Sequence, residues 1–339
     1  MPRTQAEALA GGKGEAEDEG RRRPGVPPAV QRRGINHLAN RIRSAAMSTR
    51  FDLQSHSTHS DGALPAAEVV QRAAEAGVEL LALSDHDTVS GVSEAIEAGK
   101  RLGVKVVPAV EISAVDADSP VPRELHILGY NIDHSGAVLT AKLAEFLADR
   151  EHRTLRMRDA LREVGFELDE AEIEERIAQG KPIGRPHLAG AVLGAAANAA
   201  RLEEEEIDDI GSLIRGYLIE GKAAFRLRQT PTVAEAVEAI HEAGGVAIWA
   251  HPFWDISDEG EVLSTIDRFK ALGIDGVEAF YVTHDEEQTK LLAKRCEELG
   301  LLSTGSADYH GPDNRLFSRF MAFETFGLEP NLGPISGAE

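Results

Sequence analysis

The sequence predicts an α/β fold in which about seven strands form a parallel sheet or a barrel. Three observations support this prediction. Short apolar runs alternate with amphipathic helical runs over 51–113 and again from Thr232 onward. A histidine or a carboxylate residue stands at or near the end of most apolar runs. Between the two alternating parts lies one long stretch with helical character and no strand signal.

The first alternating part predicts the order β-α-β-α-β. Pro65 suits the first turn of a helix, Gly77 suits its end, and Gly103 ends the second helix. The apolar runs between these helices have the length and composition of buried strands. The expected elements are a strand from 51, a helix at 65–76, a strand at 78–83, a helix at 88–102 and a strand at 104–110.

The middle of the chain begins with one more expected strand, at 125–132. After it the pattern is helical, with helices expected at 138–164, 169–179 and 188–200. The first of these helices carries an arginine-rich stripe that includes Arg150 and Arg153. This stripe is expected to be a solvated helix face, and the alternative is that one arginine reaches the functional site.

The alternation resumes after Thr232. The expected elements are a helix at 232–243, a strand at 246–250, a helix at 260–272, a strand at 276–281, a helix at 285–299 and a strand at 301–304. Because each strand returns after a helix, the carboxyl ends of the strands are expected to share one rim.

The predicted organisation is a disordered tail at 1–48, a barrel built from 49–135 and 222–325, a helical insertion at 136–221 over the active site, and a C-terminal tail at 326–339. The first tail has few large apolar side chains, so it cannot bury enough surface to offset its ordering entropy. Met47 directly precedes the first strand and is an alternative to Met1 as the start of translation.

The charge balance and the single cysteine limit the partners and the compartment. The net charge is −21. A protein this acidic cannot coat a phosphate backbone non-specifically, so the expected partner is a small phosphorylated molecule and no extended nucleic-acid surface is expected. No apolar run is long enough to cross a bilayer, so no membrane partner is expected. Cys296 cannot form an internal disulfide, which suits a cytoplasmic protein.

Imidazole and carboxylate groups recur at equivalent positions of successive strands. The candidate metal ligands are His56, Asp61, His86, Glu111, His126, His251, Asp308 and His310. A single histidine after a strand is more often a packing or surface residue, but a set of this size at one rim indicates a metal centre. Imidazole with carboxylate selects Zn, Mn or Fe, and a carboxylate can bridge two ions. Such a site lowers the pKa of a bound water and holds a phosphoryl group.

The motifs that contain these residues resemble, in order, those of the polymerase and histidinol phosphatase (PHP) family. They are 52–62, 84–88, 108–113, 124–129, 250–252 and 305–311. The segment 183–189, Ile-Gly-Arg-Pro-His-Leu-Ala, resembles the branch of that family that contains 3′,5′-nucleoside bisphosphate phosphatase, also called ribonuclease AM. The resemblance implies a distorted (β/α)7 barrel with a helical insertion over the metal site.

The resemblance also implies two or three divalent metal ions per chain, with Mn expected and Fe or Zn as alternatives. Glu111 would bridge two ions. By position, His126 and His251 would complete one site, Asp61, His86 and His310 a second, and His56 with Asp308 the remaining one, which also uses Glu111. Asp85 and Asp87 would orient His86 from outside the ligand set.

The same resemblance implies the residues that contact the substrate. Arg185, His187 and His284 correspond to positions expected near the substrate phosphate, where a planar guanidinium can make a bidentate contact. The catalytic candidates are Asp308, Arg185 and His187. Asp308 would orient or deprotonate the nucleophile, and Arg185 would hold the phosphate.

Gln54 departs from the family pattern, which opens its first strand with His-x-His. Gln54 stands at the first of these histidines and offers only a neutral carbonyl oxygen, a weak ligand. One of the three ions is therefore in question. His59 is a possible substitute ligand, but three residues from His56 it cannot share that residue's face of a regular strand.

Two tryptophans flank the turn at His251. Trp249 and Trp254 are expected to be packing groups rather than platforms for a base. A contact between Trp254 and a base is the alternative.

The expected function is hydrolysis of small phosphomonoesters by a metal-activated hydroxide. The expected substrates are 3′,5′-nucleoside bisphosphates or the 5′ ends of short oligonucleotides. A histidinol-phosphate-type phosphatase is the alternative within the same enzyme class, and the motif at 183–189 weighs against it. Gln54 leaves open a third interpretation, a catalytically silent module that binds metal or a phosphorylated ligand.

Overall fold

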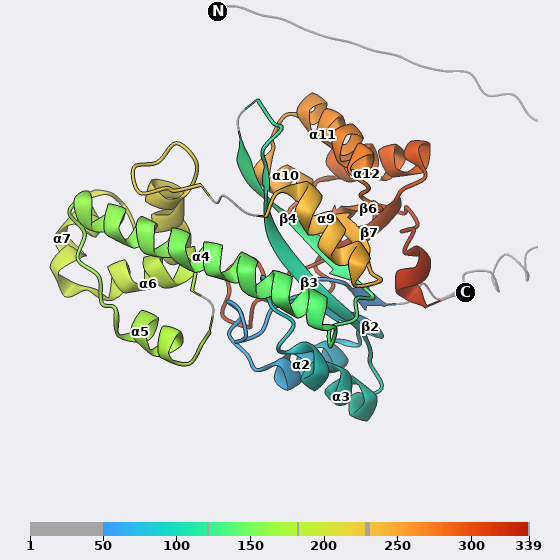
Figure 1. The fold of residues 1–339 in the computed structure, drawn as a ribbon, viewed down its shortest axis with the longest axis horizontal. Helices are drawn as coiled ribbons and strands as arrows, with labels where there is room; N and C mark the ends of the chain where they lie inside the picture. Colours follow the sequence, from blue (N-terminus) through green and yellow to red (C-terminus); the bar gives the residue numbers. More distant parts are fainter. Residues whose placement is uncertain (1–49, 121, 182, 228–230, 338–339) are drawn as a thin grey trace, which may run out of the picture. The chain divides into compact units, whose positions relative to one another are not determined.

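The structure, a computed structural model, describes residues 50–120, 122–181, 183–227 and 231–337. The predicted tail at 1–48 lies outside these residues. The strands form one seven-stranded sheet whose spatial order, β1 to β7, follows the order of the chain. Figure 1 shows helices around this sheet and a group of helices, α4 to α7, to one side of it. Among the described residues, no helix has both the length and the apolar character that a membrane span requires.

The first part of the sheet is parallel and alternates with helices, as predicted. Its elements are β1 (Phe51–Asp52), α2 (Ala66–Ala76), β2 (Leu80–Leu83), α3 (Val92–Leu102) and β3 (Lys105–Asp116). The two helices end at Gly77 and Gly103, whose φ angles of 81° and 76° lie in the left-handed region. Glycine adopts this conformation without a Cβ clash, so both glycines stop their helices.

Strand β4 (Arg123–Tyr130) departs from the parallel pattern. It pairs antiparallel with β3 on one side and with β5 (Val246–Trp249) on the other. The prediction of a parallel sheet is therefore wrong at this strand. Because β4 begins at the rim where its neighbours end, His126 reaches that rim from near the start of its strand. Glu111 likewise lies within β3 and not after it.

The parallel pattern resumes after β4. The remaining elements are α9 (Val233–Glu242), β5, α10 (Pro252–Asp255), α11 (Glu259–Ala271), β6 (Gly276–Tyr281), α12 (Glu286–Leu299), β7 (Leu302–Ser306) and a 3-10 turn at Gly333–Ser336. The edges of the sheet approach each other, because Leu53 N–H donates to the Gly305 carbonyl at 3.2 Å and His56 N–H donates to the Tyr309 carbonyl at 2.8 Å. The predicted distorted (β/α)7 barrel is confirmed.

The inner face of the sheet is apolar next to the candidate ligands. Its buried cluster includes Leu53, Ala82, Ala109, Leu128 and Ile248. Successive side chains of a strand point to opposite faces. Glu111 therefore points to the same inner face as Ala109, and His126 to the same face as Leu128.

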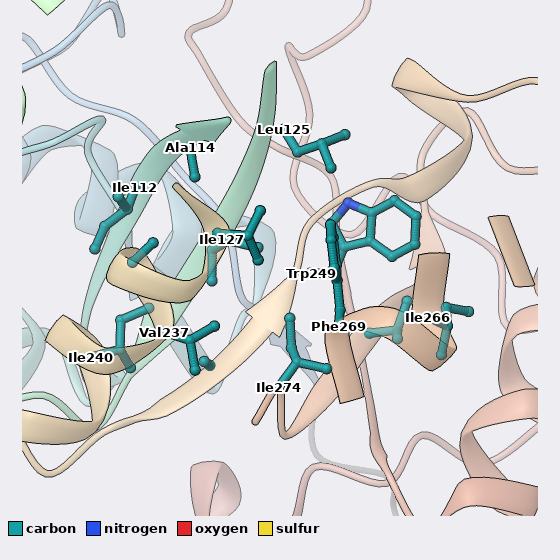
Figure 2. Close-up of a cluster of buried hydrophobic side chains, with 14 of the residues drawn as sticks. Ile112, Ala114, Leu125, Ile127, Val237, Ile240, Trp249, Ile266, Phe269 and Ile274 are labelled. Atoms are coloured by element: carbon teal, nitrogen blue, oxygen red, sulfur yellow. The ribbon is translucent and has the colours of Figure 1, made fainter. Parts of the chain in front are cut away.

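The outer face of the sheet packs against helices. Figure 2 shows Ile112, Ile127 and Trp249 from the strands together with Ile240 and Phe269 from α9 and α11. Trp249 is fully buried and packs against Phe269, with ring centroids 5.1 Å apart. Burial of one such side chain contributes about 1.5–3 kcal/mol, so this layer holds the helices against the barrel.

Between β4 and α9 the chain forms a set of helices with a hydrophobic core of its own, which we call the helical segment. It contains α4 (Ala137–Glu163), α5 (Ala171–Ala178), α6 (Arg185–Gly194), a 3-10 turn (Ala196–Asn198), α7 (Ala199–Glu204), α8 (Ile210–Leu213) and a π turn (Ile214–Leu218). Met157, Leu188 and Leu213 belong to its buried core. The predicted domain limits at 136–221 stay a prediction.

Candidate metal centre

The structure brings every candidate ligand into one cluster. The loop after β1 carries His56 and Asp61, the loop after β2 carries His86, β3 and β4 carry Glu111 and His126, the turn after β5 carries His251, and the loop after β7 carries Asp308 and His310. The loop after β1 closes tightly at Gly62, where a Cβ would lie 2.2 Å from the His56 carbonyl oxygen. Glycine at this position lets Asp61 turn back beside His56.

Glu111 is fully buried at the centre of the cluster. Its Oε1 lies 2.6 Å from His126 Nδ1 and 3.3 Å from His251 Nε2. Its Oε2 lies 3.0 Å from His56 Nε2. The two oxygens thus face different histidines, which is the arrangement expected of a carboxylate that bridges two cations. The bridging role itself stays a prediction.

The described part of the chain contains three overlapping groups of candidate ligands. Within each group the ligand atoms lie within 4.8 Å of one another. The groups are His56, Asp61, His86 and His310; His86, Glu111 and His126; and His56, Glu111 and Asp308. The predicted division differs in three respects, because His56 also joins the group of Asp61, His86 also joins the group of His126, and His251 is in none of the three groups. His251 Nε2 lies 3.3 Å from His126 Nδ1 and is thus within reach of the same ion.

Several buried atoms in this cluster fit a metal better than they fit a closed hydrogen-bond network. His56 Nε2, His86 Nδ1, His251 Nδ1 and Asp308 Oδ1 have no hydrogen-bond partner among the described residues. An unpaired buried polar atom costs about 1–3 kcal/mol. Asp308 Oδ1 lies 3.0 Å from His56 Nε2, close enough for both atoms to ligate one cation. The residues present therefore fit divalent ions of the Zn, Mn and Fe type.

The charges in the cluster set the protonation states of its ligands. Burial alone would raise the pKa of Glu111, but the imidazoles of His86 and His126 hold that pKa well below its usual range. Burial lowers the pKa of His86 to about 3. Burial also opposes protonation of His56, yet Asp308 and Glu111 raise its pKa well above the usual value. Since a metal binds neutral imidazole, a cation at His56 must displace a proton.

Backbone strain lies at the same rim. Asp87, His251 and Asp308 have φ angles of 55°, 31° and 53°. Residues other than glycine rarely adopt positive φ, and each such position costs about 1–3 kcal/mol. Strain of this kind clusters at functional sites, where the surrounding structure compensates for it.

Gln54 is fully buried beside Glu111. Its Nε2 donates to Glu111 Oε2 at 2.8 Å, and its Oε1 lies 3.2 Å from Ser306 Oγ. Gln54 thus orients the central carboxylate, and its weakness as a ligand stays a prediction. His59 belongs to none of the three ligand groups of the described chain, and its ring packs beside Gly91.

Two buried groups that the sequence interpretation missed hold the ligands in place. Glu278 accepts a hydrogen bond from His251 N–H at 2.9 Å and one from Ser306 Oγ at 2.6 Å. Burial raises the pKa of Glu278 to about 8. Tyr281 OH donates to Asp308 Oδ2 at 2.8 Å. The available signal was a glutamate inside the otherwise apolar run 276–281.

Asp85 does not have the predicted role of orienting His86. Its carboxylate accepts hydrogen bonds from the N–H and the hydroxyl of Ser57, both at 2.7 Å, and from Ser60 Oγ at 2.6 Å. Asp85 thus fixes the loop after β1, which carries His56. Asp87 accepts a hydrogen bond from Ser113 N–H at 2.9 Å.

Arginines of the helical segment reach the barrel. Arg150 and Arg153 are buried, and each pairs with a barrel carboxylate, Asp87 at 3.1 Å and Glu124 at 2.6 Å. The expectation that this stripe is solvated is therefore wrong at these two positions. Arg176 of α5 donates to the carbonyl of Ser60 at 2.6 Å, close to the ligand loop.

Arg185 and His187 lie in the first turn of α6. Arg185 Nη2 is 3.7 Å from Glu124 Oε2, and 28% of the Arg185 side chain is exposed. His187 Nδ1 accepts a hydrogen bond from Gly184 N–H at 3.0 Å. Burial and the nearby charge of Arg176 lower the pKa of His187 to about 4. The neutral ring therefore carries its proton on Nε2, and this N–H suits a phosphate oxygen.

His284 has its donor and acceptor nitrogens reversed relative to His187. Its Nδ1 donates to the Ala279 carbonyl at 3.2 Å, and burial lowers its pKa to about 4. Its Nε2 is buried and has no hydrogen-bond partner among the described residues. This nitrogen is an acceptor, so His284 suits a hydroxyl group better than a phosphate oxygen.

Comparison with known proteins agrees with this geometry. A family model described as the PHP domain matches residues 52–208. A 5′-3′ exoribonuclease of Haemophilus influenzae is 34% identical over 266 residues, which cover 78% of this chain and 92% of that protein. The chain belongs to the PHP domain family. The family prediction is thus confirmed, and with it the class of this PHP protein, a hydrolase of phosphoric esters.

Two further likenesses extend over most of this PHP protein. A 3′,5′-nucleoside bisphosphate phosphatase of Chromobacterium violaceum is 31% identical over 77% of this chain and 87% of that protein. A solved structure described as an amidohydrolase of Chromobacterium violaceum with bound sulfate and no metal has a TM-score of 0.67 and 29% identity. The match covers 80% of this chain and 90% of the chain in that structure. The similar proteins thus share the fold but carry different names for their activities.

Proposed function

We propose that this PHP protein hydrolyses small phosphomonoesters with two or three divalent ions, Mn first among them. The observation that carries the proposal is the convergence of unpaired imidazole and carboxylate atoms around Glu111. The likeness to an exoribonuclease and to a bisphosphate phosphatase supports two substrates, a 3′,5′-nucleoside bisphosphate or the 5′ end of a short oligonucleotide.

Divalent ions at this site would supply an acidified water as the nucleophile and positive charge against the phosphoryl oxygens. Tyr281 holds Asp308 through Oδ2, which leaves Oδ1 directed into the cluster. Burial opposes ionisation of Asp308, but His310 and His56 lower its pKa below the usual value. Asp308 can therefore orient the nucleophile or accept its proton. Arg185 and the Nε2–H of His187 donate to the phosphate oxygens.

The polar groups around the centre favour a nucleotide over a long nucleic acid. The net charge of −21 repels an extended phosphate backbone. Arg185, with 28% of its side chain exposed, provides local positive charge for a phosphate. His284 Nε2 adds an acceptor for which a ribose hydroxyl is a suitable donor.

The test is a phosphate-release assay with the purified, Mn-loaded protein. The panel contains 3′,5′-nucleoside bisphosphates, short 5′-phosphorylated oligonucleotides and histidinol phosphate, and elemental analysis gives the metal content. We expect fastest release from the bisphosphates, loss of activity on chelation and recovery with Mn. Release from histidinol phosphate alone would favour the histidinol-type phosphatase.

The hydrogen bond from Gln54 to Glu111 favours one competing function, the silent binding module. Metal binding without phosphate release from any panel member would support it and refute the proposed hydrolysis. Gln54→His then separates the cases. A large gain of activity from near zero identifies the natural protein as silent, whereas high activity before the substitution excludes that function.

A further inference from the structure

An exposed aromatic surface lies beside the metal centre. Trp254, on the short helix α10 that follows His251, exposes 51% of its surface. Phe317, in the loop after β7, is half-buried and lies against it, with ring centroids 5.6 Å apart. Trp249 is fully buried, as a packing role requires. About half of the Trp254 surface is therefore open to solvent beside the polar site, where a ligand can contact the indole.

Phe317 connects this surface to the candidate ligands. Its ring centroid lies 5.4 Å from that of His310 and 6.3 Å from that of Tyr281. His310 N–H donates to the Phe317 carbonyl at 2.9 Å, and Phe317 N–H donates to Asn314 Oδ1 at 3.0 Å. The phenyl ring is thus held at a defined place next to the centre.

Groups that suit phosphate and ribose lie close to the same helix. The cation is Arg185, which lies 3.7 Å from Glu124; the neighbouring Arg123 pairs with Glu261 at 2.6 Å and ties this strand to α10 by donating to the carbonyl of Asp255 at 3.3 Å. The ring centroid of His284 lies 5.6 Å from that of Phe253 in α10, and its Nε2 is an acceptor without a hydrogen-bond partner among the described residues. A ligand here would meet cations at one end and ring faces at the other, which matches the polarity of a nucleotide.

We propose that Trp254, with the ring of Phe317 tilted against it by 59°, forms a stacking platform for the base of a nucleotide whose phosphate lies at the metal centre. The inference rests on the proposed phosphoesterase function and extends it to substrate recognition. Stacking of a base on an aromatic side chain contributes about 1–3 kcal/mol and tolerates any sequence, because every base has a π-face. The platform thus favours nucleotides over base-free phosphates and discriminates little among bases.

Fluorescence tests the platform directly, because Trp249 and Trp254 are the two tryptophans of the chain. The metal-loaded protein is titrated with adenosine 5′-monophosphate and, separately, with ribose 5-phosphate. We expect saturable quenching by the nucleotide, little quenching by the sugar phosphate, and loss of the quenching in Trp254→Leu. Equal quenching by both ligands, or quenching that persists in Trp254→Leu, would overturn the proposal. So would emission that shifts with protein concentration without ligand, which would assign the rings to an interface between copies.

Kinetics supply a second measurement. In Trp254→Leu and Phe317→Leu we expect KM for the preferred nucleotide to rise by about 5- to 150-fold, which corresponds to the stacking energy. The rise in KM for ribose 5-phosphate should be several-fold smaller. Leu102→Ala is the matched control, because Leu102 exposes 45% of its surface on α3. Equal rises for both substrates would contradict the platform. If the unchanged protein releases phosphate from neither compound, the proposed function fails, and the titration still decides on the platform.

Discussion

The barrel rim and the helical segment bring opposite chemistry to one site. The barrel supplies carboxylates and imidazoles, with Glu111 and Asp308 buried among histidines. The helical segment supplies guanidinium groups, of which Arg150 and Arg153 are buried against barrel carboxylates. Figure 1 shows α4, the helix that carries both arginines, reaching from the helices of the segment to the sheet.

The charged groups of the two regions have different roles. The arginines of the helical segment stabilise the structure, whereas the imidazoles and carboxylates of the barrel rim can bind cations. A buried arginine–carboxylate pair is stable only while both partners are present, so these pairs hold the helical segment on the barrel. The contacts between imidazoles and carboxylates instead leave His56 Nε2 and Asp308 Oδ1 without hydrogen bonds in the described chain. Those atoms remain available to cations.

The change with the largest expected effect is Glu111→Gln, which removes the central charge of the barrel set. We expect loss of bound metal and a fall in kcat/KM of more than about 1,000-fold, beyond the 10- to 100-fold typical of a residue that only supports a ligand. Elemental analysis and phosphate release measure the two effects. Glu145→Gln, on the exposed face of α4, is the matched control and should change neither. Full metal content in Glu111→Gln would contradict the bridging role.

Arg150→Met removes one of the buried arginines that hold the helical segment on the barrel. It removes the guanidinium that lies 3.1 Å from the buried Asp87 carboxylate, which keeps the Ser113 N–H as a donor, so we expect the free energy of unfolding to fall by about 3 kcal/mol. Urea denaturation measures this loss. Arg162→Met is the control on the same helix, since 51% of that side chain is exposed, and its effect should stay within about 0.5 kcal/mol. Adding Asp87→Asn to Arg150→Met should restore part of the stability, and failure to do so would assign the loss to packing.

The cluster of candidate ligands could be predicted from the sequence because its signal is local. Each motif places a histidine or a carboxylate close to a strand end, as 84–88 does for His86 and 305–311 does for His310. A barrel brings such ends to one rim, so the topology converts local signals into one site. Their roles as metal ligands stay a prediction.

The direction of β4 cannot be predicted from the alternation of strands and helices, but it can be predicted from the length of the loop before it. Residues 117–122 alone separate β3 from β4. A parallel crossover needs about a dozen residues or more, so this connection requires a hairpin. The hairpin explains why His126 reaches the rim from the start of its strand.

The helical periodicity of α4 also predicts that two of its arginines are buried. The buried positions of α4 recur every three or four residues and include Leu143, Arg150, Arg153 and Met157. Arginine is rarely buried unless it is paired. The paired carboxylates lie 63 and 29 residues away in the chain, so the sequence alone does not identify them.

Arg185→Lys changes the guanidinium of the helical segment that lies next to the barrel carboxylate Glu124. Lysine keeps the charge but loses the planar fork that contacts a phosphate bidentately. We expect KM for the phosphorylated substrate to rise by about 10-fold, within the range of a hydrogen bond to a charged group. Arg295→Lys is the control, because its side chain is similarly exposed, at 25% against 28%, and pairs with Asp267 on α11. An unchanged KM in Arg185→Lys would remove this guanidinium from the phosphate site.

His187→Gln has the smallest expected effect and tests whether the helical segment keeps this ring neutral. The pKa of His187 is about 4 in the folded protein against a usual 6.5, so between these values the unfolded chain binds more protons and stability falls as the pH falls. From pH 7 to pH 5.5 we expect this residue to account for a loss of about 1 kcal/mol in the free energy of unfolding.

Glutamine at 187 can still accept the Gly184 N–H hydrogen bond, so the start of α6 is preserved while the titrating group is removed. Denaturation of both proteins at the two pH values isolates the residue, because every other titrating group is common to them. The variant should lose less stability than the natural protein by about 1 kcal/mol. Equal losses would mean that His187 is solvated and protonates freely, and its Nε2–H would then be no different from that of a surface histidine.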